Sequence, residues 1–289
     1  MRITNIYMSN PLEQLNQLEL KANFTPLERQ YFYKLRDELE AIVGGVSIEK
    51  LDKPTDVAQA RRICAKLEEI LKFVQDREME NKIWDEADCS AWLREHELEG
   101  EAFEFRDGGL IFRGNLDLSG RDIKCLPDNL HVMGGLKLDG CRSLQYLPCN
   151  LRIDETLYSN DCTLLRAVPD DLQVGKSLYL KNCTGLTSLP NSFRVPGDLY
   201  LKGCTALVHL PEELSVKGLN VQDCTALINL PDNLPTIIYL NISGCIALLS
   251  VPDSLRVDGN VTVRGCSEKI ILKIKELKKR GQILAGVIT

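Results

Sequence analysis

Between residues 116 and 266 the chain carries a pattern of apolar positions that returns every 20 or 21 residues. The repeating unit reads L-x-L-x-x-C-x-x-L-x-x-L-P-x-x-L-x-V and is clearest in residues 199–216, LYLKGCTALVHLPEELSV. A unit of this length cannot bury its own apolar residues, so neighbouring units must stack to form one continuous core. The pattern therefore predicts a solenoid of about eight repeats.

The L-x-L segment of each repeat has the period of a β-strand, with its two apolar residues directed inward and the residue between them directed to solvent. We expect these segments to pair as eight parallel strands about 4.8 Å apart. The proline later in each repeat opposes helix formation, so turns and extended segments are expected on the other side of the solenoid. The inward pairs are Leu116/Leu118, Leu136/Leu138, Leu157/Ser159, Leu178/Leu180, Leu199/Leu201, Leu219/Val221, Leu240/Ile242 and Val261/Val263.

Seven of the eleven cysteines occupy one position of consecutive repeats. We interpret them as buried thiols beneath the turn that follows each strand. The chain has no C-x-x-C pair and its three histidines are scattered, so we predict no metal site and no other cofactor. So many buried free thiols favour a reducing compartment. The seven are Cys141, Cys162, Cys183, Cys204, Cys224, Cys245 and Cys266.

Residues 1–106 lack the repeat, and we predict that they form a helical amino-terminal domain. Residues 10–13 and 25–28 both read as helix starts, with a capping side chain, a proline at the first helical position and a glutamate that closes a capping box. Another helix is expected from Asp85 to about Leu98. Two interpretations stay open for this domain, an enlarged cap for the repeats or a separate binding or targeting module.

Cys89 and His96 lie seven residues apart on one face of that last helix. A thiol nucleophile needs a lowered pKa and a base within hydrogen-bond reach, and an exposed helix face rarely provides both. No catalytic residue is therefore assigned in this region.

Residues 107–266 are the predicted repeat domain, and residues 267–289 are predicted to be a carboxy-terminal capping helix. In that helix an apolar stripe of isoleucine and leucine is surrounded by basic residues, with Ser267 at its start and Gly281 at its end. We expect the stripe to cover the last repeat. The alternative is a basic amphipathic helix that binds an acidic membrane or partner.

The outward strand positions are where we expect a binding site. Tyrosines occupy the middle position of three adjacent strands and should span roughly 10 Å. Such a column either stiffens the sheet through cross-strand stacking or provides a hot spot for a partner, and we favour the second interpretation. The neighbouring lysines indicate a partner that offers carboxylates or phosphates. The predicted partner-binding residues are Tyr158, Tyr179, Tyr200, Lys181, Lys202, Asp198 and Tyr239.

Charge and hydropathy exclude several classes of partner. The formal net charge is −6, and no basic stripe with interleaved aromatic residues occurs, so nucleic-acid binding is not expected. No apolar run approaches the ~20 residues of a membrane span, and the first residues lack the apolar core of a cleavable secretion signal. We expect a monomeric protein of the cytosolic type.

The short repeat with L-x-x-L-P, preceded by a helical region, resembles leucine-rich-repeat effectors that bacterial pathogens deliver into host cells by type III or type IV secretion. The form G-C-x-x-L-x-x-L-P at residues 203–211 is also similar to repeats of plant intracellular immune receptors. The resemblance implies an α/β leucine-rich-repeat solenoid with its parallel sheet on the concave face. Some such effectors carry a ubiquitin-ligase domain after the repeats, but only 23 residues follow Cys266 here, so its chemistry is not expected.

The function expected from these residues and this resemblance is protein–protein interaction. The chain would be a bacterial effector that reaches the host cytosol without a cleavable signal and binds a host protein on its concave face. One alternative is a ubiquitin-ligase type of protein in which the repeats select the substrate. The other is a scaffold that stays inside the bacterium.

Overall fold

The computed structural model describes Leu39, residues 60–61, 63–64 and 67, and residues 84–98 and 102–289. The chain divides into two compact units, residues 1–83 and residues 84–289. In the first unit Ala60, Ile63, Cys64 and Leu67 are helical and buried. The helix starts predicted at residues 10–13 and 25–28 lie outside the described residues.

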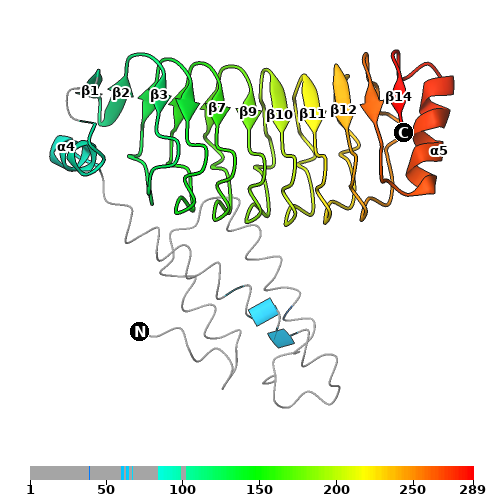
Figure 1. The fold of residues 1–289 in the computed structure, drawn as a ribbon, viewed down its shortest axis with the longest axis horizontal. Coiled ribbons are helices and arrows are strands. Elements are labelled where there is room, and N and C mark those ends of the chain that lie inside the picture. The colour runs from blue at the N-terminus through cyan, green and yellow to red at the C-terminus, as the bar shows by residue number, and fades with distance from the viewer. Residues whose placement is uncertain (1–38, 40–59, 62, 65–66, 68–83, 99–101) are drawn as a thin grey trace. The chain divides into compact units, whose positions relative to one another are not determined.

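The second unit is a solenoid of stacked turns whose main element is a nine-stranded parallel sheet (Figure 1). All eight predicted L-x-L segments are strands of this sheet, and their first apolar residues pair in register, such as Leu157 with Leu178 and Leu178 with Leu199. The prediction of eight stacked parallel strands is confirmed. They are β3 (Leu116–Asp117), β5 (Leu136–Lys137), β7 (Leu157–Tyr158), β9 (Leu178–Tyr179), β10 (Asp198–Tyr200), β11 (Gly218–Asn220), β12 (Tyr239–Asn241) and β13 (Val261–Thr262).

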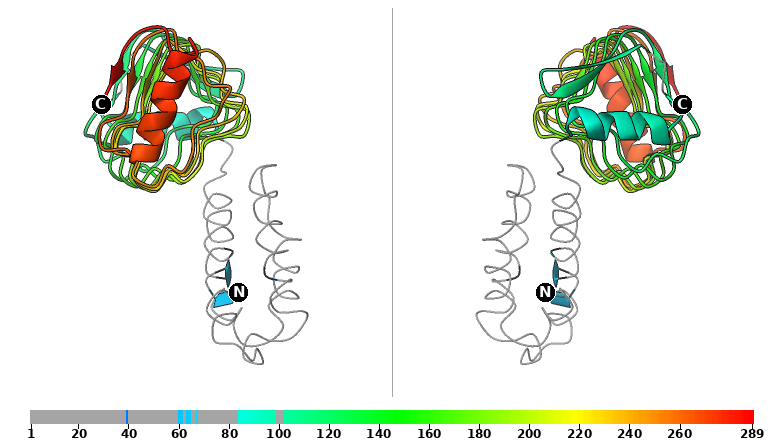
Figure 2. Two further views of the ribbon diagram at one scale, coloured as in Figure 1. Left: turned by 90° about the vertical axis from the view of Figure 1, so that its right-hand side faces the viewer. Right: turned by 90° about the vertical axis from the view of Figure 1, so that its left-hand side faces the viewer.

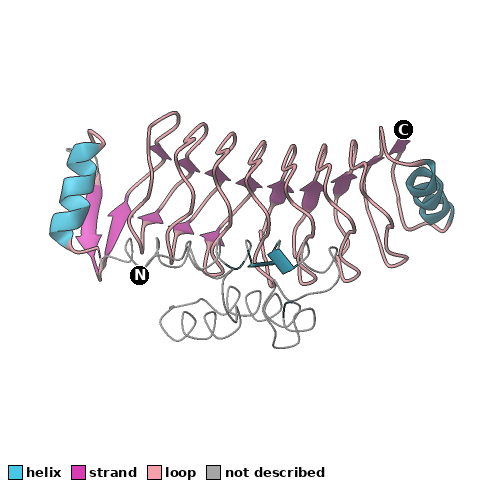
Figure 3. Ribbon diagram, turned by 90° about the horizontal axis from the view of Figure 1, so that it is seen from below, coloured by secondary structure: helices cyan, strands magenta, loops and turns pink. Residues whose placement is uncertain are grey.

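A second sheet runs along the first repeats of the unit (Figure 3). Four of its strands are parallel, and the fifth, β1, is joined to β2 by an antiparallel hairpin. Asp107 and Gly108 in the hairpin turn both have positive φ, 53° and 77°, as a two-residue turn of this kind requires. The strands are β1 (Phe103–Arg106), β2 (Gly109–Phe112), β4 (His131–Val132), β6 (Arg152–Ile153) and β8 (Gln173–Val174). The sequence predicts extended segments on the side of the solenoid opposite the nine-stranded sheet. In the first repeats these segments pair with one another as the strands of the second sheet.

The turn that follows each of seven strands of the nine-stranded sheet, β5, β7 and β9 to β13, contains one residue with positive φ. This residue directly precedes each of the seven repeat cysteines, and it is always glycine, asparagine or aspartate, the residues that adopt this conformation most readily. The turn directs the cysteine and the next leucine of the repeat into the core. All seven cysteines and the leucines that follow them, such as Leu186 and Leu207, are buried.

Helices close both ends of the core (Figure 2). At one end α4 (Glu86–Glu95) begins at the N-cap Asp85 and buries Cys89 and Trp92, and Trp92 Nε1 donates to the carbonyl oxygen of Cys125 at 3.1 Å. This core is continuous with that of the repeats. At the other end α5 (Glu268–Lys279) begins at the N-cap Ser267 and buries one apolar face.

The predicted stripe of α5 comprises Ile270, Ile271, Ile274 and Leu277, and all but Ile271 are fully buried. After α5 the chain returns to the sheet, where β14 (Val287–Ile288) pairs in parallel with β13. The sequence does not predict this ninth strand.

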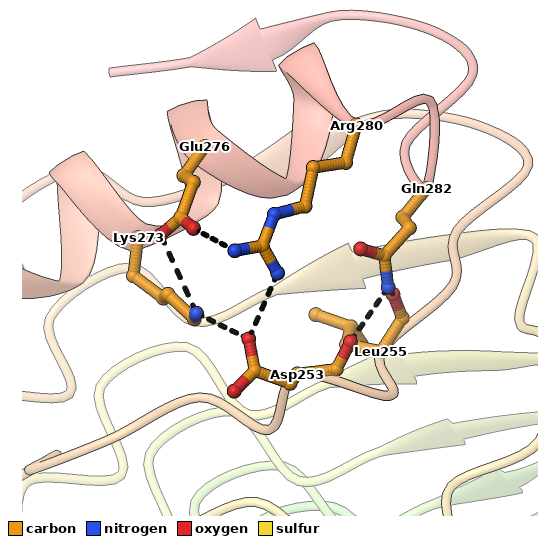
Figure 4. A network of polar contacts seen from close by, with 6 residues as sticks. All are labelled: Asp253, Leu255, Lys273, Glu276, Arg280 and Gln282. Carbon is orange, nitrogen blue, oxygen red and sulfur yellow. Dashed lines mark hydrogen bonds and ion pairs between the residues drawn. The ribbon is translucent and has the colours of Figure 1, made fainter.

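A polar network ties α5 to the turn that follows the last repeat proline (Figure 4). Asp253 Oδ1 accepts from Lys273 Nζ at 2.5 Å and from Arg280 Nη1 at 3.2 Å. Glu276 lies between these two cations and bonds to both. The Gln282 side-chain amide donates to the Asp253 carbonyl oxygen at 2.7 Å. The helix is therefore held by its polar edge as well as by its apolar face.

Candidate protein-binding face

Three tyrosines stack on the outer face of the nine-stranded sheet, and we call Tyr158, Tyr179 and Tyr200 the tyrosine ladder. They are register partners on β7, β9 and β10. The ring centroids of Tyr158 and Tyr179 are 4.8 Å apart with an interplanar angle of 18°, and those of Tyr179 and Tyr200 are 4.3 Å apart at 8°. These spacings match the separation of neighbouring strands, so the sheet itself sets the stack. The three tyrosines are half-buried.

Tyr239 extends the aromatic row because Gly218 leaves room for it. Its ring centroid is 6.3 Å from that of Tyr200. Gly218 is the register partner of both Asp198 and Tyr239, and a Cβ added there would overlap the Tyr239 ring and lie 2.7 Å from Asp198 Oδ1. The missing side chain therefore lets the Tyr239 ring occupy the space above β11.

The pKa values of two phenol groups in the row, those of Tyr179 and Tyr239, are raised. Burial, with smaller effects from Tyr200 and Asp198, raises the pKa of Tyr239 far above its ordinary value. Burial and the neighbouring Tyr200 raise the pKa of Tyr179 to about 12. Tyr239 Oη is buried and has no hydrogen-bond partner among the described residues. Tyr200 Oη donates to Asp198 Oδ2 over a long 3.5 Å.

The two predicted lysines lie beside the ladder, each two residues after its tyrosine and just past the end of β9 or β10. Lys181 Nζ is 5.5 Å from the centroid of Tyr179 and 5.7 Å from that of Tyr200. The ammonium therefore lies close to two adjacent rings of the tyrosine ladder, at nearly equal distances from their centroids. Lys202 is partly exposed and follows the next strand, β10. The structure thus brings all seven predicted residues onto one face, and the sequence did not single out Gly218, which positions Tyr239.

The repeat cysteines form a hydrogen-bonded column beneath this face, the cysteine ladder. Each thiol donates to a carbonyl oxygen at the end of the preceding repeat's strand, for example Cys183 to Ser159 at 3.0 Å and Cys204 to Leu180 at 3.1 Å. Burial raises the pKa of Cys183 to about 12. These thiols are structural donors. Within the described part of the chain, no group of three or more potential metal ligands comes together.

Cys89 and His96 do not form a reactive pair. Cys89 is buried against the core, and burial together with Asp88 and Asp85 raises its pKa to about 11. The His96 ring packs on the edge of Trp92, with ring centroids 4.9 Å apart. A nucleophilic thiol needs the opposite shift of its pKa. This geometry supports a structural role for both residues.

Comparisons with protein-family models, with curated proteins and with solved structures found no match to this chain. No described helix has the length and apolarity needed to cross a membrane.

Proposed function

We propose that this chain is a leucine-rich-repeat binding protein that holds a protein partner on the outer face of its nine-stranded sheet, the face that the repeat pattern predicts to be concave. The observation that carries the proposal is the tyrosine ladder with Tyr239 and Lys181 beside it. Four half-buried aromatic rings in one row offer a large, rigid contact area, and tyrosine is enriched among residues that dominate interface energy. A tyrosine side chain also loses little conformational freedom when a partner binds to it.

The opposing interpretation is that the stack only stiffens the sheet. Stacked cross-strand pairs do stabilise a sheet, by roughly 0.2–1 kcal/mol each. Stiffening alone, however, gives no reason for Gly218, since a side chain at that position would add sheet stability and displace the Tyr239 ring. A pre-arranged aromatic surface with an ordered, desolvated phenol at its edge accords better with recognition.

The partner is proposed to be a host protein and the chain a secreted bacterial effector, on the resemblance of the repeats described above. The ubiquitin-ligase alternative gains no support from Cys89, whose pKa is raised by burial. Appearance of the chain in the cytosol of infected cells, dependent on the secretion apparatus, would separate an effector from a scaffold that remains in the bacterium.

The binding face is tested by combining capture with measured affinity. Full-length protein would be used to isolate a partner from eukaryotic cytosol, and the purified pair would be studied by calorimetry. Alanine at Tyr158, Tyr179 and Tyr200 together should weaken binding by at least about 30-fold, as expected for loss of a hot spot worth at least about 2 kcal/mol. The matched control places alanine at Asn220, Asn241 and Thr262, which occupy the same column on β11, β12 and β13.

Equal affinities of the tyrosine variant and the wild type, with both chains folded by circular dichroism, would contradict the proposal. Loss of binding in both triple variants would point to a general effect of the sheet and not to the tyrosines.

A further inference from the structure

We infer that Lys181 and Lys202 form a subsite for a carboxylate, so that the partner lays an acidic peptide segment, carrying aspartate or glutamate, along the lysine side of the tyrosine ladder. This inference rests on the proposed binding function and specifies the chemistry of the partner.

The two lysines place like charges side by side on neighbouring strands. They follow the register partners Tyr179 and Tyr200 by two residues each, and Asn182 N donates to the Lys202 carbonyl oxygen at 2.7 Å, so the pairing continues past them. Adjacent strands are about 4.8 Å apart. Like charges directly opposite one another destabilise a sheet. The free protein therefore holds an unfavourable arrangement that an anion would relieve.

Nothing nearby in residues 84–98 and 102–289 neutralises these two ammonium groups. Neither lysine forms an ion pair with a described residue. By contrast, Lys137, Lys176 and Lys273 each pair with a carboxylate. The same column carries the neutral Asn160 and Gln222 on the flanking strands. The charge is thus available to a ligand.

The first strands of the same sheet show the alternative arrangement. Asp117 and Lys137 are register partners on β3 and β5, and Lys137 Nζ lies 3.5 Å from Asp117 Oδ2. Opposite charges there satisfy each other across neighbouring strands. The two lysines that follow β9 and β10 have no such ion pair among the described residues, and they occur beside the aromatic row.

The tyrosine ladder adds to the preference for an anion. Lys181 Nζ lies over the rings of Tyr179 and Tyr200, and because these rings are uncharged the ammonium keeps its full positive charge. The phenol of Tyr179 keeps its proton because its pKa is raised to about 12, and a protonated phenol can donate to an oxygen ligand. The phenol group of Tyr179 and the two lysines therefore favour oxygen atoms with negative charge.

Asp198 does not cancel this preference, because it lies on the other side of the ladder. It precedes Tyr200 by two residues whereas Lys202 follows Tyr200 by two, which separates their Cα atoms by roughly 13 Å along the strand. Its carboxylate accepts from Tyr200 Oη. The face is divided by the ladder into a lysine side and an Asp198 side.

Carboxylate suits the lysine side better than phosphate does. Phosphate recognition favours arginine, whose planar guanidinium bonds to two oxygens at once, whereas lysine acts as a compact point charge. The column that holds Lys181 and Lys202 has no arginine before Arg264 on the last repeat. Two adjacent point charges fit one or two carboxylate side chains of an extended peptide.

The chemistry is tested with peptide probes on the full chain labelled with carbon-13 at the lysine side chains. Three 12-residue probes would be compared, with alternating glycine and glutamate, glycine and glutamine, or glycine and phosphoserine. The glutamate probe should shift the signals of Lys181 and Lys202 saturably, with smaller shifts at higher salt, and leave the signal of Lys137 unmoved. Equal shifts at all surface lysines, no shift at Lys181 and Lys202, or much tighter binding of the phosphoserine probe would each overturn the inference.

Variants connect this subsite to the partner. Changing Lys181→Gln and Lys202→Gln together should weaken partner binding between about twofold and about 30-fold, the range for two exposed ion pairs. Lys137→Gln is the matched control and should bind as the wild type does. If the double lysine variant binds normally while the tyrosine variant does not, the carboxylate subsite is wrong and the proposed function stands. If the tyrosine variant also binds normally, the proposed function itself fails.

Discussion

Ser159 interrupts the inner apolar column of the repeats, and its replacement by alanine should stabilise the protein. The equivalent residue in the other seven repeats is leucine, valine or isoleucine. Ser159 is fully buried, with 0% of its surface exposed, and its Oγ has no hydrogen-bond partner among the described residues. A buried hydroxyl that lacks a partner costs about 1–3 kcal/mol.

The Ser159→Ala change removes only this hydroxyl, so we expect the free energy of unfolding to rise by about 1 kcal/mol, at the low end of that range. For a unit of this size the corresponding rise in Tm is about 2–4 °C. Ser159→Leu would add buried carbon at about 0.8 kcal/mol per methylene, but overpacking can remove a similar amount. Alanine is therefore the cleaner test.

Urea unfolding of the full chain, followed by circular dichroism, measures the effect. Ser177→Ala is the matched control, since Ser177 Oγ accepts from Asp198 N at 3.0 Å and its loss should destabilise by about 1 kcal/mol. If Ser159→Ala lowers the free energy of unfolding as Ser177→Ala does, the Ser159 hydroxyl has a partner and the reasoning is refuted.

Three further predictions concern the core and the end of the solenoid. Cys204→Ala removes a thiol that donates to Leu180 O and leaves a small void, so urea unfolding should show a loss of about 1–2 kcal/mol. Because burial raises the pKa of Cys183 to about 12, iodoacetamide at pH 8 should leave this thiol unmodified in the native chain and modify it in urea, as mass spectrometry would show. Lys273 holds the pKa of Asp253 below its ordinary value, so the stabilising contribution of Asp253 is present near neutral pH and is lost as pH falls through that lowered pKa. Asp253→Asn should therefore speed amide exchange in α5 at pH 7, and the difference from the wild type should disappear in acid.

The strands of the main sheet were predictable because their signal is local and repeated. The alternation of Leu178 and Leu180 fixes which residues face inward, and the constant period fixes which residues become neighbours. Once the leucines are in register, Tyr179 must lie between Tyr158 and Tyr200. The column was therefore predicted, whereas the near-parallel stacking of its rings required side-chain positions.

The missed features depend on contacts between distant segments. The two-residue strand Arg152–Ile153 has no alternation of its own and pairs only because the repeats stack. Val287–Ile288 carries no repeat signal and becomes a strand because the chain returns to β13 after α5. The role of Gly218 could have been predicted from the sequence. The repeat alignment places it between Asp198 and Tyr239, where an absent side chain leaves space for a ring. The glycine, asparagine or aspartate before every repeat cysteine was a similar signal for a residue with positive φ.

The cysteine ladder separates what holds the chain together from what the chain presents to a partner. Each thiol bonds to the adjacent repeat, as Cys224 bonds to Leu201 O at 3.1 Å and Cys245 to Val221 O at 3.0 Å. Insertion or removal of one whole repeat would leave every other thiol with an equivalent acceptor. The width of the outer face can thus change in steps of one strand, and a single outward residue can be exchanged without altering the column beneath it. A protein built in this way can acquire a new partner through duplication and point substitution while its interior stays the same.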